Sequence, residues 1–191
     1  MKKSIIILLS LFLLLISGYS IAESNQPFTS VKMNWVDDSG KAFSFESLLG
    51  QPYVLAMIYT SCRATCPVTI QKLERIRKLA TEKGISPKFV LVSFDAVNDT
   101  PETLHAFREK NSLKEGTWTL LHGSEQEVRK LSVLLGVSYQ RDAASGEITH
   151  SNQQILIDQK GAVNLTLSGL ASEVEPLIEA LLKIENQSRD E

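Results

Sequence analysis

Cysteine is scarce in this chain, with two among 191 residues. Small secreted domains that depend on disulfides carry many more cysteines, so a disulfide-stapled framework is excluded. Glycine and proline are also few, at ten and six, and there is no internal repeat or low-complexity tract, which argues against fibrous, disordered and repeat architectures. The length, with 43% hydrophobic residues, fits one ordinary globular domain with an extension and leaves no room for two full cores.

An excess of charge of either sign is also missing. Twenty Lys and Arg residues stand against 22 Asp and Glu residues, a net charge of −2 that becomes −4 if Lys2 and Lys3 are removed with an export signal. Proteins that bind nucleic acid or anionic lipid through electrostatics carry a clear basic excess. We therefore expect no nucleic-acid partner and no electrostatic attachment to a membrane surface.

A long apolar run occurs near the N-terminus, between Ile5 and Ile16. Lys2 and Lys3 precede it and small residues follow at 20–22, a pattern typical of a secretory signal with its cleavage site. We predict that residues 1–22 are an export signal peptide and that the protein is periplasmic. The alternative is an uncleaved membrane anchor, because the stretch of 18 mostly apolar residues from Ile5 to Ala22 is near the lower limit for spanning a bilayer.

The remaining chain has the pattern of an α/β domain over residues 30–185, after a linker at 23–29 and before a polar tail at 186–191. Residues 53–59 and 89–94 are almost unbroken apolar runs, which is typical of strands buried on both faces. Further predicted elements are a hairpin at 31–45, a helical turn at 46–49, strands at 117–121, 137–139, 148–149, 154–158 and 162–167, and helices at 66–83, 101–111, 124–135 and 172–184. This order predicts a mixed central sheet with helices on both faces.

The two cysteines, Cys62 and Cys66, lie between the first buried strand and its helix, as in a thioredoxin-like fold. Free amides and the positive end of the helix dipole favour thiolates there, and Arg63 adds to the effect. A disulfide between them would close too small a loop to stabilise the fold much. Dithiol oxidoreductases of this fold usually have two intervening residues, not three, so a reversible disulfide and a soft-metal site both stay open.

His150 is the candidate third ligand. It lies just before the apolar strand at 154–158, where a single histidine is more often a surface residue than a ligand. Two thiolates and an imidazole, however, form a trigonal set that suits Cu(I), and Cys and His ligands also accommodate Cu(II). We expect His105 and His122 to be solvated side chains, and Asp95 to be an acid that stabilises a turn at a strand end, with orientation of the site as its alternative role.

At these residues the chain resembles the Sco/SenC family of exported copper chaperones. The resemblance runs in order and spacing from about Phe28 to Leu182. The matching motifs are Cys-X-X-X-Cys-Pro at 62–67, Ser-X-Asp at 93–95, Asp-Thr-Pro-Glu at 99–102, and a histidine followed by an aliphatic-Leu-Ile-Asp strand at 150–158.

The resemblance implies a thioredoxin fold that binds copper through Cys62, Cys66 and His150. It implies delivery of the ion to the copper A centre of cytochrome c oxidase, or to another copper-acceptor protein, with a periplasmic thiol reductant as second partner. The alternative is a thiol:disulfide oxidoreductase that reduces the acceptor's cysteines. A peroxidase is disfavoured because no peroxide-activating Arg and Thr pattern accompanies the cysteines.

Overall fold

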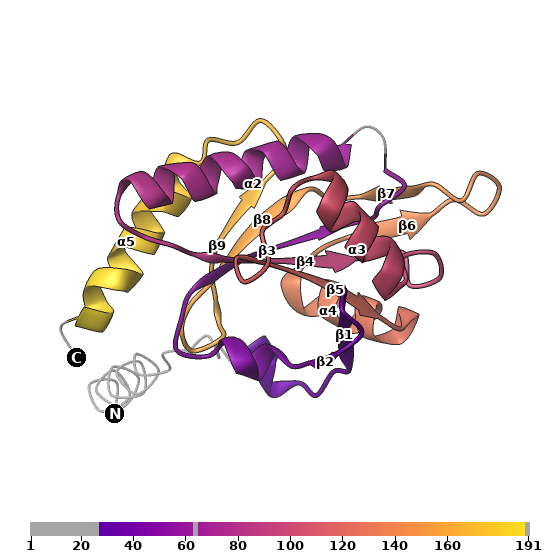
Figure 1. The fold of residues 1–191 in the computed structure, drawn as a ribbon, viewed down its shortest axis with the longest axis horizontal. Helices are drawn as coiled ribbons and strands as arrows, with labels where there is room; N and C mark the ends of the chain where they lie inside the picture. The colour runs from indigo at the N-terminus through magenta and orange to yellow at the C-terminus, as the bar shows by residue number, and fades with distance from the viewer. Residues whose placement is uncertain (1–26, 63–64, 190–191) are drawn as a thin grey trace, which may run out of the picture.

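The computed structural model describes residues 27–62 and 65–189 (Figure 1). The predicted export signal at 1–22 therefore lies outside the described residues, as does most of the linker at 23–29. The last linker residues, Phe28 and Thr29, are buried against the domain. Within the two described stretches, no helix combines the length and the apolar character needed to cross a membrane.

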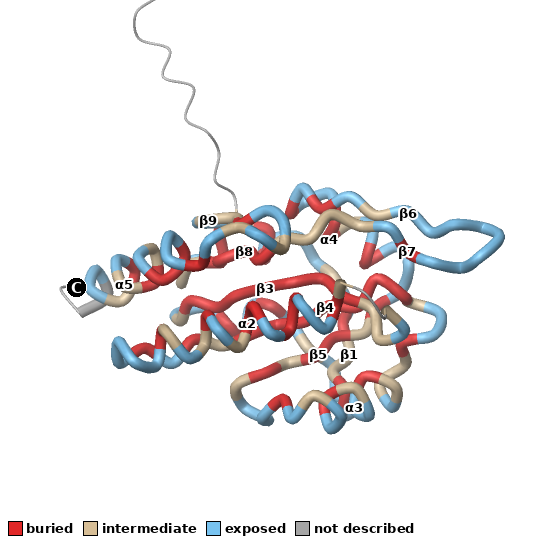
Figure 2. Tube along the Cα trace, turned by 90° about the horizontal axis from the view of Figure 1, so that it is seen from above, coloured by how far each residue is buried: buried red, intermediate tan, exposed pale blue. Residues whose placement is uncertain are grey.

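The centre of the fold is a seven-stranded mixed sheet in the order β2-β1-β5-β4-β3-β8-β9. Strands β3, β4 and β5 are parallel to one another, and the other neighbours pair antiparallel. The strands are β1 (Trp35–Asp37), β2 (Ala42–Phe43), β3 (Tyr53–Ile58), β4 (Lys88–Ser93), β5 (Trp118–Gly123), β8 (Gln153–Ile157) and β9 (Val163–Ser168). Every residue of β3 is buried, as its apolar sequence predicts for a strand covered on both faces (Figure 2).

Helices cover both faces of the sheet, which confirms the predicted thioredoxin-like fold class. The helices are α2 (Thr65–Glu82), α3 (Pro101–Lys110), α4 (Glu125–Leu135) and α5 (Glu175–Arg189), with 3-10 turns η1 (Phe28–Ser30) and η2 (Phe45–Leu48). The apolar sides of α2, α3 and α5 share one core cluster, whereas α4 and both 3-10 turns belong to a second one on the opposite face. Figure 1 shows α2 and α5 on one side of the sheet and α4 on the other.

Helix ends follow the capping signals in the sequence. The Thr100 side chain accepts a hydrogen bond from the Thr103 N–H, and Pro101 occupies the first helical position of α3. Helix α4 ends at Gly136, whose φ of 65° is the left-handed conformation that glycine adopts without strain. These local signals therefore predicted the first and last residues of both helices to within a residue or two.

The strands predicted at 137–139 and 148–149 are present, but they do not join the central sheet. They are β6 (Tyr139–Arg141) and β7 (Ile148–His150), and they pair antiparallel with each other as a separate two-stranded ribbon. Each has only three residues, and neither is hydrogen-bonded to the seven-stranded sheet. The ribbon extends beyond the sheet, with its turn exposed (Figures 1 and 2).

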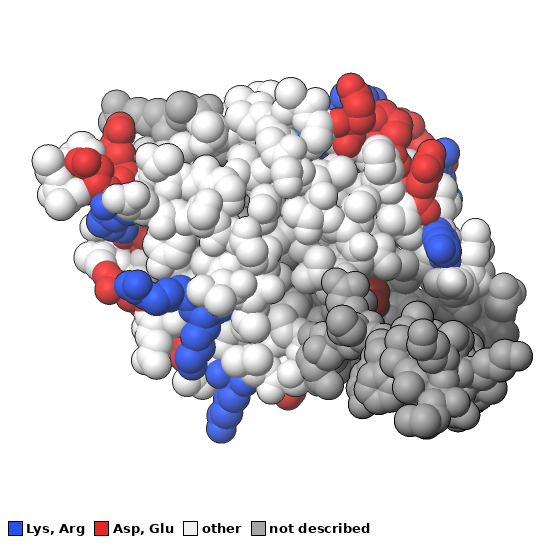
Figure 3. All heavy atoms as spheres, turned by 180° about the vertical axis from the view of Figure 1, so that it is seen from behind, with Lys and Arg blue, Asp and Glu red and all other residues white. Residues whose placement is uncertain are grey.

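The charged side chains on the face seen from behind lie mostly near its edges. Lysine and arginine are interspersed there with aspartate and glutamate, and residues of other kinds cover the middle (Figure 3). This view therefore shows no continuous surface of one charge, in keeping with the nearly balanced composition.

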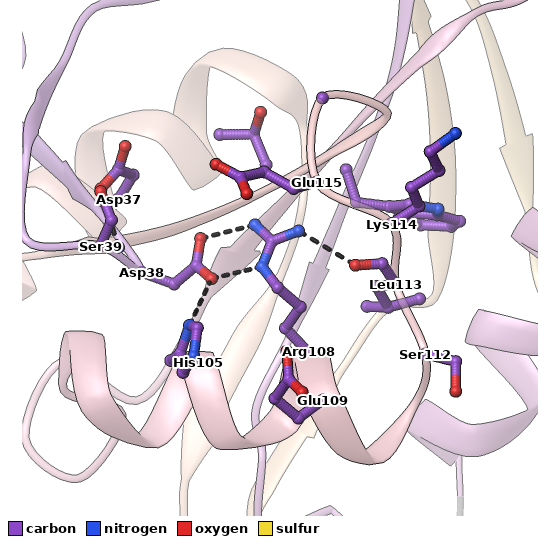
Figure 4. A pocket seen from close by; sticks show the side chains of 13 residues that line it. Asp37, Asp38, Ser39, His105, Arg108, Glu109, Ser112, Leu113, Lys114 and Glu115 are labelled. Atoms are coloured by element: carbon purple, nitrogen blue, oxygen red, sulfur yellow. Dashed lines mark hydrogen bonds and ion pairs between the residues drawn. The ribbon is translucent and has the colours of Figure 1, made fainter.

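A buried ion pair fastens the N-terminal hairpin to α3 (Figure 4). The Arg108 Nε and Nη2 atoms donate to the two carboxylate oxygens of Asp38, and Nη1 donates to the Leu113 carbonyl oxygen at 3.1 Å. The side chains of Asp38 and Arg108 are only 6% and 9% exposed. Because the fork of a guanidinium matches a carboxylate in a bidentate way, the pair fixes both position and orientation.

We expect Arg108→Met to lower the free energy of unfolding by about 3–5 kcal/mol, since it leaves the Asp38 carboxylate buried without its countercharge. Urea denaturation of the reduced protein measures the loss. The matched control is Arg75→Met, which breaks a pair with Glu175 whose side chains are 58% and 53% exposed, so its effect should be much smaller. Equal losses in the two variants would contradict a structural role for the buried pair.

Candidate functional site

Cys62 and Cys66 lie where the chain leaves β3 and enters α2. Both are free thiols; Cys62 is half-buried and Cys66 is 1% exposed. The Cys62 Sγ accepts a hydrogen bond from the Cys66 backbone N–H, with 3.4 Å between the heavy atoms, and lies 3.3 Å from the Thr65 Oγ1. Arg63, which the sequence suggested as a further influence on the thiols, lies outside the described residues.

The two thiols ionise in opposite ways. Burial tends to raise the pKa of Cys62, but hydrogen bonds from the side chain of Thr65 and from the N–H of Cys66 outweigh it and lower the pKa to about 6. Deeper burial dominates at Cys66 and raises the pKa of its thiol to about 12. Near neutral pH, Cys62 is therefore a thiolate and Cys66 a thiol, so the half-exposed sulfur is also the nucleophilic one.

His150 is the last residue of β7 and is half-buried. Its Nδ1 lies 3.1 Å from the Ser151 carbonyl oxygen, which places a proton on Nδ1 because the carbonyl can only accept. The Nε2 atom is buried and has no hydrogen-bond partner in the described part of the chain. An imidazole whose Nδ1 is held by a backbone carbonyl, and whose Nε2 has no partner among the described residues, has the arrangement of a metal-ligating histidine.

Cys62 and His150 line the same cavity, of about 520 Å³, together with Tyr59, Thr65 and residues of the ribbon. Cys66 is not among the lining residues. Among the residues that the structure describes, no group of three Cys, His, Asp or Glu side chains lies close enough to hold one ion. The structure thus brings two of the three predicted ligands to one cavity, while the third, Cys66, lies in the core and donates its N–H to the Cys62 sulfur.

Two aromatic residues that the sequence did not single out contact the His150 ring. The ring centroid of Tyr59 lies 6.0 Å away in an edge-on arrangement, and that of Phe94 lies 4.7 Å away. Burial and a hydrogen bond with Cys62 raise the pKa of Tyr59 to about 12, so its hydroxyl keeps its proton beside the sulfur. Both residues follow directly on strand ends near the motifs, a signal that could have identified them.

Asp99 connects the cysteine loop, which is the segment between β3 and α2, to the end of β4, whereas Asp95 contacts the ribbon. The buried Asp99 carboxylate accepts hydrogen bonds from the backbone and hydroxyl of Thr60 and from the Ser93 hydroxyl. Asp95 accepts from the Asn98 N–H, as expected of an acid in a turn, but it also forms an ion pair with Arg141 of β6. Its contacts therefore extend beyond the turn that the sequence indicated.

The other histidines lie elsewhere. The His105 side chain is 58% exposed and lies 3.6 Å from the Asp38 carboxylate. His122 is half-buried, and its Nδ1 is 2.8 Å from the Asp99 carbonyl oxygen, so it is less solvated than predicted. Neither lines the cavity that holds Cys62.

Comparison with known proteins places these features in a family. The SCO1/SenC family model matches residues 22–185. The SCO1 protein homolog of Bacillus subtilis is 24% identical over 169 residues, which cover 85% of each chain. A putative copper-binding protein of Stutzerimonas stutzeri is 26% identical over 136 residues, which are 69% of this chain and 65% of that protein, so the match spans a little under two thirds of the latter.

Solved structures share the fold. A SCO1/SenC family lipoprotein from Bacillus anthracis superposes with a TM-score of 0.75 at 27% identity, covering 81% of this chain and 94% of that one. BsSco, described as a member of the Sco family of cytochrome c oxidase assembly proteins with a disulfide switch, gives a TM-score of 0.72 at 20% identity over 87% and 96% of the two chains.

We predict that the alkylation rate of Cys62 in the reduced protein follows an ionisation with a midpoint near pH 6, since only the thiolate reacts and its pKa is about 6. Iodoacetamide labelling followed by mass spectrometry measures the rate at each pH. In Thr65→Val, which removes a stabilising hydrogen bond, the midpoint should rise towards the ordinary value of 9.0. A midpoint near 8.5 in the unsubstituted protein would contradict the assignment.

Proposed function

The chain belongs to the SCO1/SenC family, and from this membership we propose that it binds one copper ion through Cys62, Cys66 and His150 and passes it to a respiratory copper enzyme. The relative from Stutzerimonas stutzeri, named as a putative copper-binding protein, supports copper as the cargo. The name of BsSco, from a family of cytochrome c oxidase assembly proteins, supports the copper A centre of that oxidase or another copper-acceptor protein as the recipient.

The observation that carries this proposal is the buried Nε2 of His150, which has no hydrogen-bond partner among the residues that the structure describes. Burying a nitrogen without a partner costs free energy. Because His150 lines the cavity that also holds Cys62, a soft cation bound there would supply the partner. Two sulfurs and one imidazole suit Cu(I), and the same set accommodates Cu(II). Because the three groups do not meet in the structure, loading requires the cysteine loop and the ribbon to approach each other.

The difference between the thiols sets the proposed order of ligation. Cys62, a half-exposed thiolate near neutral pH, is the first donor to an arriving ion. Cys66 binds only after it releases its proton, so loading liberates about one proton for each ion at neutral pH. Release to an acceptor begins at the half-exposed Cys62 sulfur, which the acceptor's ligands can reach, and Cys66 takes up a proton again once the ion has left.

The proposed cellular setting is the periplasm. Residues 1–22 act as an export signal, and the domain at 30–185 carries the copper site. The stretch predicted as a polar tail from residue 186 onward continues α5 as far as Arg189. The name of the Bacillus anthracis relative, a lipoprotein, supports an exported protein held at a membrane. A periplasmic thiol reductant completes the proposal, because both cysteines must be reduced before copper binds.

A second candidate function is thiol:disulfide exchange, favoured by the pairing of an accessible thiolate with a buried thiol. The Cys62 thiolate attacks the acceptor's disulfide, forming a mixed disulfide and releasing one acceptor thiolate. Cys66 then loses its proton and attacks the Cys62 sulfur, which releases the second acceptor cysteine reduced and leaves a Cys62–Cys66 disulfide. The periplasmic reductant returns this disulfide to the dithiol.

We expect His150→Ala to lose the thiolate-to-Cu(II) charge-transfer band and to bind copper at least about 100-fold more weakly, since even the outer partners of metal ligands are worth 10–100-fold. A copper titration of the reduced protein, monitored by absorbance, measures both. His105→Ala is the matched control and should titrate like the unsubstituted protein. A normal spectrum and affinity in His150→Ala would exclude the proposed ligand set.

The same variant separates the two functions. If the protein only exchanges disulfides, His150→Ala should reduce the acceptor's disulfide at an undiminished rate, and the copper-loaded protein should not transfer metal to the reduced acceptor. If it carries copper, metal transfer should fail in this variant, whatever the rate of disulfide reduction.

A further inference from the structure

The ribbon that carries His150 depends on the body of the domain for its position. Strands β6 and β7 pair only with each other, and an isolated pair of three-residue strands is not stable alone in water. The ribbon extends past the end of the sheet in Figure 1. The contacts between the ribbon and the body therefore determine where the imidazole lies.

One face of the ribbon makes these contacts. In β6, Tyr139 and Arg141 are two residues apart and so point to the same side, and they pair with His150 and Ile148 of β7. The intervening cross-strand pair is exposed, whereas Ile148 is buried and both Tyr139 and His150 are half-buried. Arg141 is itself exposed, but it lies on the same side of the ribbon as the imidazole.

Two consecutive residues of the body receive this face. The Phe94 ring lies 5.1 Å from the Tyr139 ring and 4.7 Å from the His150 ring, measured between centroids. The next residue, Asp95, accepts from the Arg141 Nη2, with 2.7 Å between nitrogen and oxygen. A charge-assisted hydrogen bond is shorter and stronger than a neutral one, so this pair adds a directed contact to the aromatic packing.

The Asp95 carboxylate needs this partner. Its side chain is only 3% exposed, against 36% for Arg141. Asn98 donates to Asp95 through its backbone and side-chain amides, but these groups are neutral, and Arg141 supplies the countercharge. Burial tends to raise the pKa of Asp95, and the hydrogen bonds from Asn98 and Arg141 lower it instead. A buried carboxylate therefore attracts the ribbon through Arg141.

We propose that Arg141 is a positioning residue, which through its ion pair with Asp95 holds the ribbon in the register that keeps His150 beside Cys62. For copper this inference rests on the proposed function. For the metal-free protein it stands on the contacts alone: the charged pair acts together with the aromatic contacts and the buried Ile148 to attach the ribbon to the body.

Hydrogen exchange of the reduced, metal-free full chain tests the attachment. In Arg141→Gln, amides of residues 139–150 should exchange about tenfold faster, because the buried carboxylate is left without its countercharge. Arg141 also donates from Nη1 to the Gly146 carbonyl oxygen in the ribbon turn, so Asp95→Asn, which leaves that contact in place, should reproduce the effect. Arg141→Lys should recover part of the protection, since it keeps the charge.

The matched control is Arg129→Gln on α4, because Arg129 lines the same groove as Arg141. It should leave exchange in the ribbon unchanged. If Arg141→Gln and Asp95→Asn both exchange like the unsubstituted protein, or if their effects simply add in the double variant, the ion pair does not position the ribbon and the inference fails.

Copper titration then separates this inference from the proposed function. Arg141→Gln should bind Cu(II) about tenfold more weakly, a smaller loss than for His150→Ala, because its ligands remain but are held less well. If ribbon exchange is faster in Arg141→Gln but His150→Ala binds copper normally, the ligand set is refuted and the attachment is retained. If ribbon exchange in Arg141→Gln is normal but His150→Ala no longer binds copper, the attachment is refuted and the ligand set is retained.

Discussion

The structure depends on the parallel pairing of β3 with β4 at the centre of the sheet. The two strands pair in register from Tyr53 with Lys88 to Ile58 with Ser93, so they end together at one edge. The segment after β3 carries the cysteines, and the segment after β4 carries Phe94, Asp95 and Asp99. Burial of these strands on both faces, which contributes to the hydrophobic stabilisation of the fold, therefore also brings the parts of the site together.

The two cysteines show how one motif acquires two chemistries. They stand four residues apart, but Cys62 precedes α2 and accepts hydrogen bonds, whereas Cys66 lies within its first turn and is packed in the core beneath the helix. The backbone amide that stabilises the Cys62 thiolate belongs to Cys66. Ionisation of one thiol and protection of the other therefore arise from the same turn of backbone.

Local signals in the sequence predicted most of the fold. Apolar runs located β3 and β4, and Thr100, Pro101 and Gly136 located helix ends, because such patterns depend only on near neighbours. No local sequence pattern predicts the Asp38–Arg108 pair, which joins residues 70 positions apart. The separation of β6 and β7 from the sheet was also missed, since periodicity identifies a strand but not its partner.

For the site, the same limit applies. The cysteines and His150 were identified by residue type and spacing, and the structure places Cys62 and His150 at one cavity. Tyr59 and Phe94 were not identified, although each directly follows a buried strand, and Arg141 was not identified because its contact with Asp95 joins residues far apart in the sequence.

The independence of the ribbon from the sheet has a thermodynamic consequence. An element that adds no rung to the seven-stranded ladder can detach at a free-energy cost well below that of global unfolding, as a separate cooperative unit. The lifetime of anything held between the ribbon and the cysteine loop is then set by this local opening. Substitutions at the exposed positions of the ribbon should therefore change that lifetime more than they change the global stability of the scaffold.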